Sequence, residues 1–212
     1  LGYESHAHYV LEERMAESPS KVLDFLNDIQ SKAIKHAKNE FDELTAYAHQ
    51  LDQIQKIQKW DGTYYSEKLK KEKFAIDDEL LRPYFQLENV VDGVFKTAQK
   101  LFGITFKQRN DIDVYHEDVI TYEVLSDKNE HLAVFYADFF PRPGKRQGAW
   151  MTSFRSQKIE DNRNIRPHVS IVCNFTKPTD ELPSLLSFQE VTTLFHEFGH
   201  ALHGIFANGN YA

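Results

Sequence analysis

The spacing of the apolar residues changes once along the chain, close to Gly103. Before this glycine, apolar residues recur every three or four positions, which is the period of an amphipathic helix. After it, apolar and β-branched residues gather in short runs separated by turn-forming residues, which is typical of strands. Only the stretch from Ser187 onward returns to the helical period. This order of elements predicts an α+β fold that is predominantly helical and has a small β-sheet.

The helical region covers residues 1–103. Ser18 followed by Pro19 is a typical helix start, because serine caps the helix and proline is tolerated in its first turn. Neither Gly nor Pro interrupts the apolar pattern that follows, so one long helix is expected, and Gly103 is expected to end the last helix of the region. The expected helices cover residues 3–17, 19–55, 63–75, 76–81 and 87–101.

Residues 104–212 are expected to form the small sheet and one final helix. Ser187 and Glu190 have the spacing of a capping box, in which each side chain bonds to the other residue's backbone N–H at the start of a helix. The runs joined by residues 126–130 are expected to pair as a hairpin. The expected strands cover residues 104–106, 119–125, 132–137, 149–151 and 169–175.

Composition excludes several classes of protein. Lys and Arg number 25 against 32 Asp and Glu, a net charge of −7, which offers no basic surface to a nucleic acid. No apolar run approaches the roughly 20 residues of a membrane span. Cys173 is the one cysteine, so a metal site would have to use His and carboxylate ligands. We therefore expect neither nucleic acid nor membrane as a partner.

The final helix carries a His-Glu-x-x-His motif at His196, Glu197 and His200. Residues four apart share one helix face, so the two imidazoles can bind one tetrahedral Zn²⁺ with the glutamate beside it. Zinc lowers the pKa of a bound water, and Glu197 is placed to take its proton during attack on a carbonyl carbon. The motif therefore indicates amide hydrolysis. The alternative is an ordinary helix with surface histidines.

Two further residues of this helix bear on the site. Gly199 costs about 1 kcal/mol relative to Ala in a helix, which suggests that something approaches the backbone closely. His203 lies on the face of His196 but three residues past His200, so we expect it to contact substrate or support the ligands rather than bind the metal. A catalytic zinc site uses three protein ligands, and no carboxylate follows His200. If the third ligand is a carboxylate from a following helix, it lies beyond residue 212.

The residues around the motif resemble the thimet oligopeptidase family of zinc metallopeptidases, which includes neurolysin, oligopeptidase A and bacterial peptidyl-dipeptidase (dipeptidyl carboxypeptidase). The resemblance rests on Leu-Phe-His-Glu-Phe-Gly-His-Ala-Leu-His-Gly at 194–204, Lys-Arg-Gln-Gly-Ala-Trp-Met at 145–151 and Val-Cys-Asn-Phe at 172–175. It spans at least residues 138–212. The helical first half fits the family more loosely, through Trp60-Asp61 and Tyr64-Tyr65.

This resemblance implies a zincin-like (neurolysin-like) metallopeptidase fold, truncated in this chain, that cleaves short peptides rather than folded proteins. It gives His196 and His200 as ligands of one zinc ion, Glu197 as the general base, and a Glu on the next helix as third ligand. Residues 104–212 would be the N-terminal part of the catalytic domain. The chain starts at Leu1 without Met, so we expect a piece of a longer protein. Because it supplies only two zinc ligands, we expect this piece to be inactive alone. Endopeptidase and dipeptidyl carboxypeptidase action both stay open.

Strand residues before the motif are candidates for substrate binding. In zinc peptidases of this helix type, an exposed edge strand near the metal pairs with the substrate backbone. Gly148, Ala149 and Trp150 are our candidates, because Gly and Ala leave room for a peptide. The alternative is that Trp150 and Met151 only fill the core.

A second hypothesis for the whole chain is a helical scaffold or interaction module with a vestigial zinc motif. The long helix over residues 19–55 and the missing third ligand support it. A cytoplasmic location is expected, with the periplasm as the alternative. The sequence leaves the oligomeric state undetermined.

Overall fold

The computed structural model of this chain describes residues 2–75 and 78–211. The chain divides into two compact units, Leu1–Ile76 and Asp77–Ala212. The helix over residues 87–102 belongs to the second unit because its apolar face packs on the sheet. The sequence predicted a domain boundary at residue 103, where the apolar period changes. That boundary stays a prediction.

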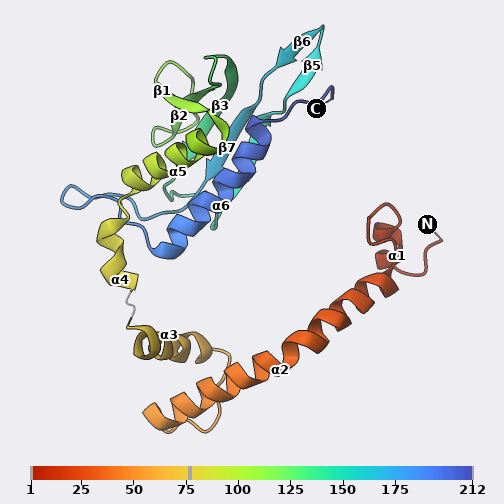
Figure 1. The fold of residues 1–212 in the computed structure, drawn as a ribbon, viewed down its shortest axis with the longest axis vertical. Helices are drawn as coiled ribbons and strands as arrows, with labels where there is room; N and C mark the ends of the chain where they lie inside the picture. Colours follow the sequence, from red (N-terminus) through yellow and green to blue (C-terminus); the bar gives the residue numbers. More distant parts are fainter. Residues whose placement is uncertain (1, 76–77, 212) are drawn as a thin grey trace. The chain divides into compact units, whose positions relative to one another are not determined.

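The first unit consists of three helices, α1 (His6–Leu11), α2 (Pro19–Asp52) and α3 (Gly62–Phe74), coloured red to ochre in Figure 1. Ser18 caps α2 by accepting a hydrogen bond from the Lys21 N–H, and Pro19 is its first residue, as the sequence predicted. The long helix is confirmed; it ends at Gln53, which has a left-handed backbone. The first helix is shorter than expected, because Ser5 caps it just before His6 and the chain turns after Leu11, where the Arg14 N–H donates to the Leu11 carbonyl.

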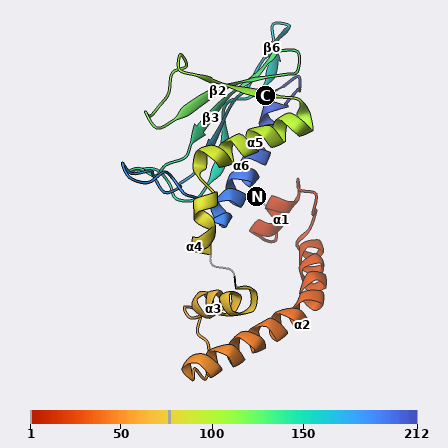
Figure 2. The same ribbon diagram turned by 60° about the vertical axis from the view of Figure 1, so that its left-hand side comes forward.

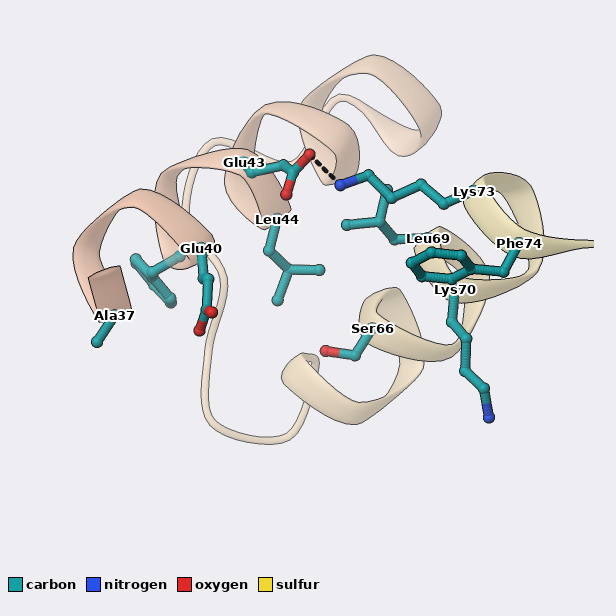
Figure 3. Close-up of a pocket in the computed structure, with 10 residues that line it drawn as sticks. Ala37, Glu40, Glu43, Leu44, Ser66, Leu69, Lys70, Lys73 and Phe74 are labelled. Atoms are coloured by element: carbon teal, nitrogen blue, oxygen red, sulfur yellow. Dashed lines mark ion pairs between the residues drawn. The ribbon is translucent and has the colours of Figure 1, made fainter. Parts of the chain in front are cut away.

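A small core joins α2 and α3. Ala48, Ile57 and Tyr65 are buried there, and the Tyr65 hydroxyl donates to Asp52 at 3.0 Å. A hollow of about 460 Å³ lies beside this core. Figure 3 shows the apolar side chains from both helices that line it and the ion pair between Lys73 and Glu43. Packing at one end of α2 therefore holds α3 in place.

The second unit begins with α4 (Asp78–Leu81), a 3₁₀ turn η1 (Arg82–Tyr84) and α5 (Leu87–Phe102), visible in Figure 2. Gly103 ends α5 with a φ of 70°, as predicted. The expected helix over residues 76–81 includes residues 76 and 77, which lie outside the described part.

A five-stranded sheet follows, in the order β1-β2-β3-β7-β4. The strands are β1 (Thr105–Arg109), β2 (Ile120–Leu125), β3 (His131–Asp138), β4 (Trp150–Arg155) and β7 (His168–Val172). β2 and β3 form the predicted hairpin, β3 and β7 run parallel, and β4 runs antiparallel to β7. The sequence missed one feature, the two-stranded ribbon of β5 (Lys158–Glu160) and β6 (Arg163–Ile165).

Helix α5 and the last helix, α6 (Phe188–Ile205), pack on the sheet side by side (Figure 1). Phe95 of α5 stacks on Phe106 of β1 with ring centroids 4.1 Å apart, and Phe135 of β3 and Phe198 of α6 complete the aromatic cluster. Burying such rings supplies most of the packing energy. The expected mixture of helices with a small sheet is confirmed, and α6 is fixed to the sheet by its apolar face.

Candidate functional site

The start of α6 is fixed by the capping box that the sequence predicted. Ser187 accepts a hydrogen bond from the Glu190 N–H at 3.2 Å, and the Glu190 carboxylate accepts one from the Ser187 N–H at 2.7 Å. Leu194, Phe198 and Ala201 are buried against the sheet. The opposite face of the helix, which carries the histidines, therefore points outward.

The two motif histidines face each other on α6. Their Nε2 atoms are 3.2 Å apart, and both side chains are exposed. Two nitrogens bound about 2.05 Å from one ion at the tetrahedral angle lie about 3.3 Å apart. His196 and His200 therefore fit as two ligands of one tetrahedral metal ion.

Glu197 lies on the inner side of the pair. Its side chain is only 8% exposed, yet it lines a cleft of about 410 Å³ together with His200 and His203. The other wall of the cleft is formed by Ala149, which precedes β4, and by Trp150 and Met151 of β4. The structure thus brings five of the seven sequence-predicted site residues into one cleft; His196 stands beside it, facing His200.

Gly148 is the other predicted site residue that does not line this cleft. It has a φ of 95°, a conformation that favours glycine, and it leads the chain into β4. Asn174 donates two hydrogen bonds there, to the Gly148 carbonyl at 2.7 Å and to the Arg146 carbonyl at 3.0 Å. Gly148 therefore sets the path of the strand, and Asn174 holds it.

Strand β4 lies at the edge of the sheet. Among the described strands it pairs only with β7, so its other edge carries unpaired backbone groups. Such an edge can bind an extended peptide as an additional strand. The Arg146 guanidinium lies over the Trp150 ring, 5.7 Å from its centroid, and orients that side chain at the cleft.

A buried ion cluster supports the loop that leads into β4. The Asp138 carboxylate, 1% exposed, accepts two hydrogen bonds from Arg142, one from Lys145 and one from the Tyr115 hydroxyl. Burial raises the pKa of Asp138, but the hydrogen bonds from Arg142 and Lys145 outweigh burial and hold that pKa below its usual value. Sequence reasoning missed this cluster, although the charged residues between two predicted strands gave a signal.

Arg166 fixes the far end of α6. Its guanidinium donates to the carbonyls of Ile205 at 2.8 Å, Ala207 at 3.1 Å and Leu132 at 2.7 Å. The last carbonyls of a helix lack partners within the helix, so a cation is stabilising there. Both ends of the motif helix are therefore held in place.

Cys173 is a packing residue of the main core. It is fully buried, and burial together with the nearby Glu197 charge raises the pKa of its thiol to about 12. A thiol with this pKa is not a nucleophile at neutral pH.

Two findings concern what the described residues lack. Within residues 2–75 and 78–211, no group of three or more His, Cys, Asp or Glu side chains is placed to hold a metal ion. None of the helices described there combines the length and the apolar character needed to span a membrane.

Fold and cleft together define a chain in which a helix presents two facing histidines beside an open sheet edge. All 212 residues match the family model described as peptidase family M3. The chain is 42% identical to oligopeptidase A of Salmonella typhimurium over 204 residues, which cover 96% of this chain and 30% of that protein. It is also 42% identical to dipeptidyl carboxypeptidase of the same organism, over all of this chain and 31% of that protein.

A third relative, mitochondrial intermediate peptidase of Yarrowia lipolytica, is 34% identical over 97% of this chain and 30% of its own length. The chain therefore belongs to peptidase family M3, as the resemblance implied. It spans about three tenths of the length of the relatives it matches.

Proposed function

We propose that this chain carries part of the active site of a zinc metallopeptidase that hydrolyses short peptides. The observation that carries the proposal is the cleft itself. At this cleft and beside it lie an exposed histidine pair with the spacing of two zinc ligands, an acidic side chain next to them, and a free strand edge. The names of the relatives, oligopeptidase A and dipeptidyl carboxypeptidase, support peptide hydrolysis.

The metal would be held by His196 and His200 through Nε2. Since a catalytic zinc site uses three protein ligands, we propose that a third ligand, a glutamate by family resemblance, comes from outside residues 1–212. When bound, a zinc ion supplies Lewis acidity, which makes water a stronger nucleophile near neutral pH and polarises a carbonyl group. Residues 77–212 would then form part of a zincin-like catalytic domain.

The chain's own residues contribute binding and proton transfer. The free edge of β4 would pair with the substrate backbone and orient the scissile carbonyl toward α6. Glu197 would accept the proton of the attacking water and pass it to the leaving amine, since its carboxylate lines the same cleft. Trp150 and His203 would contact side chains of the peptide.

The test is Glu197→Gln in a polypeptide of the relatives' length. This substitution keeps the shape of the side chain and removes the base. We expect the hydrolysis rate of a fluorogenic short peptide to fall by about 10²-fold or more, with zinc content unchanged. His200→Ala, in contrast, should lower both the rate and the zinc content.

Glu130→Gln is the matched control, because Glu130 is exposed in the β2–β3 turn of the same unit. This substitution should leave the hydrolysis rate and the zinc content unchanged. Full activity of Glu197→Gln would refute the assignment of the base. Zinc retention at the wild-type level in His200→Ala would refute the assignment of the metal site.

A further inference from the structure

Met151 lies where the substrate cleft meets the core. It is a β4 residue that lines the cleft beside Glu197 and His200, and it also packs against the main hydrophobic core. Methionine is unbranched and has three rotatable bonds, so its terminal methyl adapts to the space available. The position of this side chain therefore affects the width of the cleft.

Gly204 of α6 gives Met151 its space. A Cβ atom at Gly204 would lie 2.8 Å from the Met151 Cε, 3.2 Å from a Val169 methyl and 3.8 Å from the Ser153 hydroxyl. No Cβ fits at 2.8 Å from a carbon atom without a shift of the neighbour. Gly199 of the same helix differs, since a Cβ there meets nothing within 4 Å among the described residues. The close approach that the sequence suggested at Gly199 is thus found at Gly204.

The two neighbours of Gly204 differ in how they can respond. Val169 is fully buried and β-branched, so its χ1 is restricted and it has little room to move. Met151 is partly buried and borders the cleft, so its terminal methyl can swing away from the helix. A larger residue at position 204 would therefore push the Met151 methyl toward the cleft.

We propose that Met151 is a specificity-determining residue, whose side chain limits the size of the peptide side chain that the cleft accepts, and that Gly204 sets its position. This inference rests on the proposed peptidase function. It predicts that removing the Met151 side chain widens the cleft, whereas adding a methyl group at Gly204 narrows it.

The experiment compares Met151→Ala, Gly204→Ala and the double variant in a polypeptide of the relatives' length. Each variant is assayed with pairs of peptides that differ only by Ala or Phe at one position, and each position is taken in turn. The ratio of kcat/KM for the Phe peptide to that for the Ala peptide is the Phe/Ala ratio at that position. One methylene in an apolar pocket changes such ratios about tenfold or more. We expect Met151→Ala to raise the ratio about tenfold at one position, Gly204→Ala to lower it there by a similar factor, and the double variant to match Met151→Ala.

A binding measurement separates this inference from the proposed function. Peptide affinities measured by calorimetry in a Glu197→Gln background should show the same Phe/Ala selectivities without hydrolysis. If the wild type does not cleave peptides, the proposed function fails, while the affinities still test the role of Met151.

Gly93→Ala is the control for helix propensity, because a Cβ at Gly93 in α5 meets nothing within 4 Å. It should leave the selectivity unchanged. Thermal unfolding of all variants shows whether selectivity changes without loss of the fold. The inference is overturned if Met151→Ala leaves selectivity unchanged, or if Gly204→Ala has the same effect with and without the Met151 side chain.

Discussion

Asp138→Asn is expected to destabilise the second unit locally and strongly. The Asp138 carboxylate accepts bonds from Arg142 at 2.8 and 2.9 Å, from Lys145 at 2.8 Å and from Tyr115 at 3.0 Å. An Asn side chain keeps one acceptor and turns an NH₂ group toward two of these donors. Lys145, with a side chain only 3% exposed, would then be a buried charge without its carboxylate.

Breaking a buried ion pair from one side costs about 3–5 kcal/mol in the free energy of unfolding. The change should concentrate in the loop that Lys145 also holds through the Asp138 and Phe140 carbonyls. Hydrogen–deuterium exchange should therefore speed up over residues 139–149, before β4, by about 10²-fold or more, since about 1.4 kcal/mol corresponds to tenfold.

Acid should lower the stability of the second unit by protonating the same Asp138 carboxylate. Asp138 has a pKa below its ordinary value of 3.8 in the folded protein, so its stabilisation is complete above that value. It is lost as the pH falls through the lower folded pKa. As the pH falls below about 4, the wild type should lose stability through this group, and Asp138→Asn should lose less.

Asp111→Asn is the matched control, since Asp111 pairs with Arg109 through a side chain that is 66% exposed. An exposed pair contributes about 1 kcal/mol or less, so exchange over residues 139–149 should not change. Equal effects of the two substitutions, or no faster exchange in that loop in Asp138→Asn, would refute the role of the buried cluster.

Three other predictions follow from burial and from the ligand count. Phe198→Ala should lower the free energy of unfolding, measured by urea denaturation, by about 3–5 kcal/mol. Phe195 on the same helix is 41% exposed, so Phe195→Ala should lower it much less. Equal losses would contradict the packing of α6. Cys173 should resist iodoacetamide at pH 8 in the native protein, as mass spectrometry would show, and rapid labelling would contradict its burial. Residues 1–212 alone should bind zinc weakly and cleave no peptide, so submicromolar affinity by calorimetry would reveal a missed third ligand.

The helical part of the candidate site could be predicted because its signals are local. A capping box spans four residues and the histidine motif spans five, so both lie within about one turn of helix and can be recognised without tertiary structure. The long helix α2 was predicted for the same reason, since its period persists without Gly or Pro.

Other features could not be predicted with the same certainty. The first helix ends six residues early, and the β5–β6 ribbon was missed because three-residue strands carry too little period to detect. Gly148, Ala149 and Trp150 were chosen as an expected edge strand in which Gly and Ala leave room for a peptide. Only the structure separates Gly148 from the two residues that line the cleft.

The sequence by itself determined that α6 presents two histidines and a glutamate on neighbouring faces, because a helix repeats every 3.6 residues whatever surrounds it. Only the tertiary structure decided that β4 is an edge strand, that its residues form the other wall of the cleft, and that Gly204 leaves room for Met151. These facts depend on strand order and on contacts between residues about 50 positions apart, which no local pattern records. The chemical groups of this site therefore lie on one helix, while the shape of its cleft comes from the packing of that helix on the sheet.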